Sequence, residues 1–399
     1  MATFGILVGG GPAPGINGVI GAAATVALRQ GARVIGCLDG FKWLMEGDTS
    51  HVRELALADV ARVHLQGGSI LHTSRANPTK KPEHLENVVK SLAALGVDHL
   101  ITIGGDDTAF SARRVAEQAQ GRIRVAHVPK TIDNDLPLPP GIPTFGYETA
   151  RELATTLLEN LIEDCQTTNR WFFVVLMGRK SGSLALGAGK SAGAPITLIP
   201  EEFPPGRIRL DDVVRTLEGA VVKRLAFEGR NDGVAVIAEG VAERRDEKDL
   251  EILSEVPLAR VLKSAVTDAL AARGVKIASG EKDVGYELRC NKPTAFDRDY
   301  TRDLGAGAVF ALLDGHYNVL ITRQAEKIVP VPFADLMDAK TGKTRVRDVD
   351  TATGWFRAAR ALQTRVEPGD LDDAKRLEAI AKAAKLSPAE AKKRYAPIG

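Results

Sequence analysis

The segment Pro129-Lys130-Thr131-Ile132-Asp133-Asn134-Asp135 gathers ionisable and polar side chains directly after the apolar run 123–128. Such a run predicts a buried strand, and open α/β sheets bind ligands at the carboxyl ends of their strands. A carboxylate in this place can accept the proton of a hydroxyl that attacks phosphorus, which makes Asp133 a candidate general base. The ammonium of Lys130 can neutralise charge on a transferring phosphate. The alternative is an Asx-turn loop that carries a surface lysine.

A second polar turn, Gly104-Gly105-Asp106-Asp107-Thr108, follows the apolar run 100–103. Asp106 is a candidate Mg²⁺ ligand, since magnesium sites use one or two carboxylates and let phosphate and water complete the octahedron. Asp107 is unexpected beside a phosphate because like charges repel, and it could exclude a larger polyphosphate while tolerating a smaller one. The alternative is that both acids only cap the helix that follows.

A third turn, Gly9-Gly10-Gly11-Pro12-Ala13-Pro14-Gly15-Ile16-Asn17, follows the first apolar run and opens a predicted helix. Glycines let backbone N–H groups approach a phosphate, and a helix N-terminus favours an anion. The turn has neither the GxGxxG of a Rossmann dinucleotide site nor the GK[ST] ending of a Walker A loop. By itself it is equally compatible with a tight strand-to-helix connection that binds nothing.

The elements that position these turns alternate between strand-like and helix-like runs, which predicts mostly parallel sheets with helices on both faces. Strands are expected over 3–8, 33–38, 98–103, 123–128, 171–177, 195–199, 232–238 and 317–322. Helices are expected over 15–30, 83–95, 108–119, 147–164, 208–226, 257–273, 299–313 and, as a surface helix, 370–395. The predicted fold class is α/β, with two Rossmann-like three-layer domains. They comprise 1–145 plus about 290–335, and 146–289 plus about 336–399.

Composition narrows the function classes. The 399 residues carry a net charge of +2, so no basic excess points to nucleic acid or an anionic membrane as partner. Three scattered cysteines fit reduced thiols, and no histidine or cysteine spacing predicts a zinc site. Without a signal peptide or a bilayer-spanning apolar run, the chain is expected to be cytoplasmic.

Taken together, the motifs resemble the phosphofructokinase family from about residue 3 to 325. The matching segments, in order, are GGGPAPGIN (9–17), GGSILHTSR (67–75), GGDDT (104–108), PKTIDND (129–135), MGRKSG (177–182), IPEE (199–202) and GYELR (285–289). Known members transfer a phosphoryl group to the 1-hydroxyl of fructose 6-phosphate with Mg²⁺. The resemblance therefore implies the phosphofructokinase fold, this reaction and this cofactor.

Two positions indicate the phosphoryl donor. Family members that use ATP typically have glycine where Asp107 and Lys130 stand, whereas members that use inorganic pyrophosphate have the aspartate and the lysine, as here. Asp107 would lie where the α-phosphate of ATP belongs and repel it, and Lys130 would compensate the charge of pyrophosphate. The resemblance thus implies pyrophosphate as donor and a readily reversible reaction.

The resemblance also implies a role for each matching residue. Asp133, Lys130 and Asp107 are the catalytic candidates, Asp106 is the metal ligand, and the first domain holds the donor. Donor contacts are expected from Gly10, Gly11, Arg75, Gly105 and Thr108. Contacts to the sugar phosphate are expected from Thr131, Ile132, Asp133, Arg170, Met177, Gly178, Arg179, Glu201, Tyr286 and Arg289, with Glu202 as a rival of Glu201. In the family the arginine matching Arg170 reaches a neighbouring subunit, which implies a homodimer or homotetramer.

Other hypotheses remain open at this point. An ATP-dependent phosphofructokinase with atypical donor residues is the nearest, and an inactive regulatory subunit of the same fold is another. A lipid or nicotinamide nucleotide kinase also carries a GGDG-like turn but lacks the MGR and TIDND motifs. A dehydrogenase would need a proper GxGxxG turn. Tyr286 departs from the histidine of bacterial ATP-dependent members, although a phenol can still hydrogen-bond a phosphate.

Overall fold

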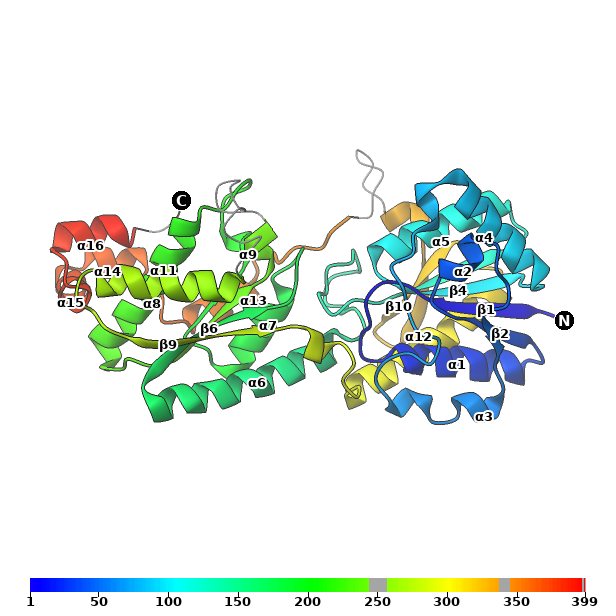
Figure 1. Cartoon of the computed structure of the whole chain (residues 1–399), viewed down its shortest axis with the longest axis horizontal. Coiled ribbons are helices and arrows are strands. Elements are labelled where there is room, and N and C mark those ends of the chain that lie inside the picture. The colour runs from blue at the N-terminus through cyan, green and yellow to red at the C-terminus, as the bar shows by residue number, and fades with distance from the viewer. Residues whose placement is uncertain (244–256, 337–344, 397, 399) are drawn as a thin grey trace. The chain divides into compact units, whose positions relative to one another are not determined.

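A computed structural model of the chain describes residues 1–243, 257–336, 345–396 and 398 (Figure 1). The chain divides into two compact units, each built from two separate stretches. The first unit comprises Met1–Ala150 and Tyr286–Arg347, and the second comprises Arg151–Gly285 and Asp348–Gly399. Both units are α/β with mostly parallel sheets, so the predicted fold class is confirmed. In the described ranges no helix is both long and apolar enough to cross a bilayer.

The first unit contains a seven-stranded sheet in the order β11-β10-β5-β4-β1-β2-β3. Its strands are β1 (Thr3–Val8), β2 (Arg33–Cys37), β3 (Val52–Glu54), β4 (His99–Gly104), β5 (Arg124–Pro129), β10 (Val319–Gln324) and β11 (Lys327–Pro332). The five central strands are mutually parallel, and the two edge strands run antiparallel to their neighbours. Parallel strands place all their carboxyl ends at one edge of the sheet.

Helices cover both faces of this sheet, because its central strands are apolar on both sides. Alternate residues of β1 (Phe4, Ile6 and Val8) pack in a core with α1 and α12, whereas Leu7 packs in the core of α4 and α5. The helices of this unit are α1 (Ile16–Arg29), α2 (Lys42–Met45), α3 (Leu57–Val60), α4 (Pro82–Ala94), α5 (Asp106–Ala119) and α12 (Ala295–Leu313). This arrangement is the three-layer sandwich that positions the glycine turns.

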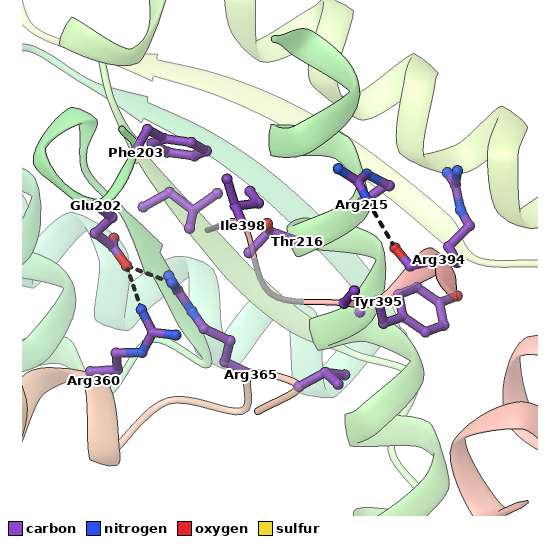
Figure 2. Close-up of a pocket in the computed structure, with 13 residues that line it drawn as sticks. Glu202, Phe203, Arg215, Thr216, Arg360, Arg365, Arg394, Tyr395 and Ile398 are labelled. Carbon is purple, nitrogen blue, oxygen red and sulfur yellow. Dashed lines mark hydrogen bonds and ion pairs between the residues drawn. The ribbon is translucent and has the colours of Figure 1, made fainter. Parts of the chain in front are cut away.

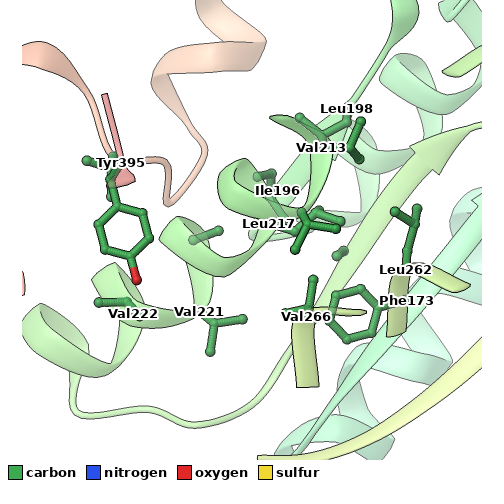
Figure 3. Packing of buried hydrophobic residues seen from close by; sticks show 14 of the residues in the cluster. Phe173, Ile196, Leu198, Val213, Leu217, Val221, Val222, Leu262, Val266 and Tyr395 are labelled. Carbon is green, nitrogen blue, oxygen red and sulfur yellow. The ribbon is translucent and has the colours of Figure 1, made fainter. Parts of the chain in front are cut away.

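The second unit contains a four-stranded parallel sheet in the order β7-β8-β6-β9. Its strands are β6 (Arg170–Leu176), β7 (Ile196–Leu198), β8 (Gly233–Ala238) and β9 (Ala278–Val284). Its helices are α6 (Tyr147–Thr168), which begins in the first unit, α7 (Ser183–Ala192), α8 (Leu210–Glu228), α9 (Gly240–Glu243), α11 (Leu258–Ala271), α13 (Gly354–Ala361), α14 (Pro368–Asp372), α15 (Ala374–Ala384) and α16 (Pro388–Arg394). Phe173 of β6 packs with Leu262 and Val266 of α11, and Leu217 of α8 belongs to the same core (Figure 3).

The C-terminal tail differs from the single surface helix expected over 370–395. The chain forms α14, α15 and α16, which are separated by caps at Asp373 and Ser387 and by Lys385 in the left-handed conformation. Ile380 and Tyr395 are buried in the same core as β6. The prediction of a purely surface helix was wrong. It was based on the alternating charges of the solvent-facing side chains and did not account for the apolar side chains on the opposite face.

Three edge strands, β3, β9 and β11, were also missed in the sequence, and β3 has only three residues. β9 reads ASGEKDV, without apolar alternation, because only one of its edges pairs and most of its side chains are at least partly exposed. β11 contains Pro330 and Pro332, which argue against a central strand but are tolerated at a sheet edge. In addition α12 begins at Ala295, four residues before the expected start, because Thr294 caps it.

A buried carboxylate ties the tail to the second unit and can be tested. Glu218 of α8 has no exposed surface and accepts hydrogen bonds from Arg273, Arg394 and Tyr395. Glu218→Ala removes the buried carboxylate that Arg273 and Arg394 share, although Arg394 stays 3.7 Å from Asp211, so we expect a loss of about 3–5 kcal/mol in the free energy of unfolding. Chemical denaturation of the variant measures it. Glu378→Ala on the exposed side of α15 is the control and should change stability by at most about 0.5 kcal/mol. Equal, small effects would contradict the docked tail.

Candidate functional site

Three polar turns lie side by side at the carboxyl edge of the first unit's sheet. β1, β4 and β5 are adjacent and parallel, and their register pairs Val8 with Ile103 and Gly104 with Pro129. The strands therefore end level with one another, and each is followed by one of the turns predicted to bind a ligand. Hydrogen bonds connect the start of two turns to the end of β4, from Gly9 N–H to the Ile103 carbonyl (2.9 Å) and from Lys130 N–H to the Gly104 carbonyl (2.8 Å).

The ammonium group of Lys130 is buried among these turns. The residue is only 4% exposed, and its Nζ donates a hydrogen bond to the Gly11 carbonyl. Burial, together with the positive charges of Arg289 and Arg75, lowers the pKa of Lys130 to about 8 against the opposing effect of Asp133 and Asp135. A lysine with this pKa is still mostly protonated at neutral pH and can supply a positive charge to an anion in the site.

Thr108 fills the space between two of the turns. A β-carbon added to Gly9 would lie 2.5 Å from Thr108 Oγ1, and one added to Gly104 would lie 2.3 Å from Thr108 Cβ. Thr108 is buried, with 5% of its surface exposed. The glycines at 9 and 104 are thus required for close approach of the Thr108 side chain, which gives this candidate donor contact a packing role as well.

Asp106 and Asp107 form the first turn of α5, where the helix dipole favours negative charge. The two side chains differ in exposure, since Asp106 is half-buried and Asp107 is exposed. Asp106 Oδ1 accepts the backbone N–H of Asp107 (2.9 Å). Asp106 therefore accepts a backbone hydrogen bond at the start of α5, whereas Asp107 is exposed. Both lie at the sheet edge where Lys130 is buried.

Two arginines predicted to bind phosphate lie near the first glycine turn. Gly10 N–H donates to the carbonyl of Ser74 (2.8 Å), which brings the exposed Arg75 beside the turn. A β-carbon on Gly11 would lie 3.7 Å from the guanidinium carbon of Arg289. That guanidinium stacks on the ring of Tyr286 at 4.7 Å, and Tyr286 is 78% exposed. Both groups of the GYELR motif are thus available to a ligand.

The loop after β5 holds Asp133 through local hydrogen bonds. Asp133 N–H donates to Thr131 Oγ1 (3.1 Å), and the Thr131 carbonyl accepts the hydroxyl of Thr144 (2.7 Å). Ile132 is buried, with 5% of its surface exposed, so only its backbone is at hand for a ligand. Asp133 itself is half-buried. The loop therefore presents a carboxylate on a backbone that its own side chains brace.

In the second unit, the MGR motif follows the carboxyl end of β6. Gly178 has φ 138°, a left-handed conformation that favours glycine, and its N–H donates to Glu239 Oε2 (3.3 Å). Arg179 Nε pairs with Glu239 Oε1 at 3.7 Å, and its side chain is 62% exposed. Met177 N–H donates to the Val284 carbonyl (3.0 Å). Glu239 thus orients the motif from the end of β8.

The neighbouring acids Glu201 and Glu202 have different surroundings. Glu202 accepts hydrogen bonds from Arg365 (2.5 Å) and pairs with Arg360 (3.5 Å), as Figure 2 shows, and its side chain is 4% exposed. Glu201 Oε1 accepts N–H groups of Gly182 (2.9 Å) and Val349 (3.0 Å).

The second oxygen of Glu201, Oε2, is buried and has no hydrogen-bond partner among the residues that the structure describes. Burial raises the pKa of Glu201. Buried acceptors in proteins are nearly always satisfied, so this oxygen is suited to a ligand hydroxyl. Glu202 already pairs with two arginines, so Glu201 is the better candidate for the contact to the sugar.

Arg170 lies apart from the other candidates of its unit. It begins β6, whereas Met177 and Arg179 follow the end of that strand, and seven residues of strand span roughly 20 Å. Its guanidinium pairs with Asp164 (3.3 Å) and donates to Thr168 (2.6 Å). The structure therefore does not bring Arg170 to the MGR motif of its own chain.

Sequence reasoning missed two residues that support the site. His127 of β5 donates from Nε2 to the Gly104 carbonyl (3.0 Å) and accepts the Thr102 hydroxyl, while burial lowers its pKa to about 3 and keeps it neutral. It holds the backbone directly before Gly105. Glu239 follows β8 as Asp106 follows β4, so an acid after a buried strand was the available signal.

Comparison with known proteins places the chain among its relatives. The family model described as phosphofructokinase matches residues 3–312. The chain belongs to the phosphofructokinase family. Within the family it is 50% identical to the pyrophosphate–fructose 6-phosphate 1-phosphotransferase of Thermotoga maritima, over 98% of this chain and 97% of the relative. It is 48% identical to the protein of the same name from Naegleria fowleri, over 97% and 93%. An ATP-dependent 6-phosphofructokinase of Mycobacterium tuberculosis is 32% identical over 83% and 93%.

Solved phosphofructokinases share the fold. The structure from Saccharomyces cerevisiae matches with a TM-score of 0.69 at 21% identity, covering 99% of this chain, which spans about half (49%) of that longer chain. The pyrophosphate-dependent phosphofructokinase from Nitrosospira multiformis matches with a TM-score of 0.68 at 17% identity, over 92% and 93% of the two chains.

The packing role of Thr108 against Gly9 can be tested by mutation. Gly9→Ala adds a methyl group against the Thr108 side chain, and we expect overpacking to cost about 1–3 kcal/mol in the free energy of unfolding. Thr108→Ala in the same chain removes the contacting atoms and should restore most of that loss, as chemical denaturation can measure. Gly354→Ala, which meets nothing within 4 Å, is the control. Purely additive losses in the double variant would rule out the packing role.

Proposed function

We propose that this protein catalyses the reversible, Mg²⁺-dependent transfer of a phosphoryl group from pyrophosphate to the 1-hydroxyl of fructose 6-phosphate. The products are fructose 1,6-bisphosphate and phosphate. The observation that carries the choice of donor is the buried ammonium of Lys130 against Gly11, with Asp107 exposed on the adjoining turn. The relatives at 50% and 48% identity, which are named for this reaction, support it.

On the donor side, the turns of the first unit bind pyrophosphate. The glycines Gly10, Gly11 and Gly105 let the backbone approach its oxygens closely, although the Gly10 N–H itself is bonded to the Ser74 carbonyl, and Thr108 and Arg75 flank them. Lys130 neutralises charge on the phosphate that departs. Asp107 repels the α-phosphate of ATP, which would extend beyond the space that pyrophosphate needs.

On the acceptor side, Asp133 takes the proton of the 1-hydroxyl as its oxygen attacks phosphorus. The bond between the transferred phosphorus and the bridging oxygen of pyrophosphate then breaks, and phosphate leaves with that electron pair. Thr131 and the Ile132 backbone contact the reacting end. Arg289 and Tyr286 bind the 6-phosphate, for which Arg offers planar bidentate donors. Met177, Gly178, Arg179 and Glu201 contact the sugar phosphate in the proposed complex.

Asp106 fits the role of the single protein ligand to Mg²⁺. In the described part of the chain no three His, Cys, Asp or Glu side chains converge as a metal cluster. Sites that use one carboxylate and complete the octahedron with phosphate and water oxygens need no such cluster. Bound there, Mg²⁺ would screen the charge of the pyrophosphate oxygens.

The position of Arg170 suits an assembly. Because it lies at the opposite end of β6 from Arg179, we assign it to the sugar-phosphate site of a second copy in a homodimer or homotetramer. The first unit is the donor unit and the second the sugar-phosphate unit. We place the enzyme in the cytoplasm.

The choice of donor predicts distinct substrate profiles. With Mg²⁺ and fructose 6-phosphate, wild-type protein should turn over pyrophosphate and not ATP, followed as fructose 1,6-bisphosphate. Asp107→Gly should let ATP bind by removing the repelling charge and making room. Asp107→Asn is the matched variant, since it removes the charge and retains the size, so it separates the two causes. ATP turnover by the wild-type protein would overturn the donor, and no turnover with either donor would favour an inactive regulatory subunit.

The lowered pKa of Lys130 predicts a pH dependence. Lys130 is charged below pH about 8 and loses its charge above it. Because kcat/KM reports the ionisation of the free enzyme, kcat/KM for pyrophosphate should fall as the pH rises through about 8. Lys130→Arg keeps its charge at this pH, so the remaining activity of that variant should lack the fall.

Stability supplies the control for this prediction. The folded-state pKa of Lys130 lies below its usual value of 10.5, so the unfolded chain binds more protons between these values. The free energy of unfolding of the wild-type protein should therefore rise, relative to Lys130→Met, as the pH goes from about 8 to 10.5. A pH-independent difference between the two proteins would refute the lowered pKa.

A further inference from the structure

Arg347 makes four hydrogen bonds to the loop that carries Asp133. Its Nε donates to the Asn134 carbonyl (3.0 Å), its Nη1 to the Ile142 carbonyl (2.7 Å) and its Nη2 to Asn134 Oδ1. The backbone N–H of Arg347 donates to the Asp135 carbonyl (2.9 Å). One side chain from the far end of the first unit's sequence thus closes both ends of the segment 134–142.

Asn134 transmits this contact to the residues beside Asp133. It adopts a left-handed backbone conformation (φ 59°), and its Oδ1 also accepts the N–H of Thr144 (3.0 Å). The Thr144 hydroxyl in turn binds the Thr131 carbonyl (2.7 Å). A continuous chain of hydrogen bonds therefore runs from Arg347 through Asn134 and Thr144 to Thr131, around the residue whose carboxylate is the proposed base.

The composition of the loop explains why it needs such an anchor. Residues 136–143 read LPLPPGIP, and the prolines have no N–H to donate. The backbone bonds within this stretch, from Leu138 to Leu136 and from Ile142 to Pro139, are local. The loop must therefore be fixed through its carbonyl oxygens, and a guanidinium offers five donors in a rigid fork. Burial lowers the pKa of Arg347, but an arginine remains charged.

We propose that Arg347 is a positioning residue for the catalytic base Asp133, an inference that rests on the proposed function. It acts through Asn134 and touches no reacting atom. Two residues further along the chain, Val349 N–H binds Glu201, the candidate sugar contact of the second unit. The stretch 347–349 thus braces one candidate residue or loop in each unit.

Kinetics of three variants test the proposal. Arg347→Met should lower kcat about 10–100-fold, because small misplacement of a catalytic group costs on the order of 10²-fold. KM for fructose 6-phosphate and for pyrophosphate should change less, since most of the proposed binding groups, such as Arg289 and Gly11, lie outside this loop. Arg347→Lys should recover part of kcat. Arg345→Met is the matched control, because Arg345 is exposed and makes its side-chain bond to the Asp335 carbonyl. It should behave like wild type.

A second readout needs no activity. Amide hydrogen exchange in peptides covering 131–146 should be faster in Arg347→Met than in wild type or Arg345→Met, while exchange in β5 is unchanged. Asn134→Ala should reproduce the loss of kcat, and combining it with Arg347→Met should add little. If the wild-type enzyme is active and Arg347→Met has the same kcat and the same amide exchange as wild type, the positioning role is overturned. If the wild-type protein does not use pyrophosphate, the proposed function fails instead, and exchange still decides the anchor.

Discussion

The buried ammonium of Lys130 constrains the residue types and the backbone positions of the surrounding turns. A positive charge in this place must be desolvated, and its hydrogen bond to the Gly11 carbonyl offsets only part of that cost. The bond requires the backbone of the first turn to approach closely, and a β-carbon on Gly10 would lie 3.3 Å from Nζ. Asp133 and Asp135 on the same loop oppose the effect of burial and of Arg289 but do not cancel it, since the pKa of Lys130 stays lowered. Glycine turns, lysine and carboxylates are therefore one interdependent arrangement.

The adjoining strands make this arrangement possible. β1, β4 and β5 end level with one another, and neutral His127 holds the Gly104 carbonyl beneath the second turn. Thr108 fills the gap between the turns, which limits the room beside Gly9 and Gly104. In the second unit, acidic side chains position the candidate site. Glu239 accepts a hydrogen bond from the MGR turn, and Glu202 pairs with two arginines. Among the described residues, Oε2 of Glu201 has no hydrogen-bond partner and is therefore suited to a ligand.

The parts that could be predicted from sequence are those with a local signature. Central strands such as β1 and β5 are continuous apolar runs, so their place and the polar turns after them follow from the sequence. The edge strands β3, β9 and β11 lack that signature because most of their side chains are at least partly exposed, and they were missed, whereas the buried edge strand β7 was predicted. The tail was assigned to the surface because its charges are visible in the sequence and its burial against α8 is not.

The sequence by itself determined the family, the α/β class and the residue types of the candidate site, because each motif is contiguous and its chemistry depends on side-chain identity. Only the tertiary structure decided which of two adjacent acids keeps a buried oxygen that no residue in the described ranges hydrogen-bonds, since Arg360 and Arg365, far along the chain, pair with Glu202. It also revealed Arg347 as the anchor of the Asp133 loop. The residues around position 347 carry no sequence signal for this role. Hydrogen bonds to carbonyl oxygens depend on the path of the accepting backbone and not on its side chains.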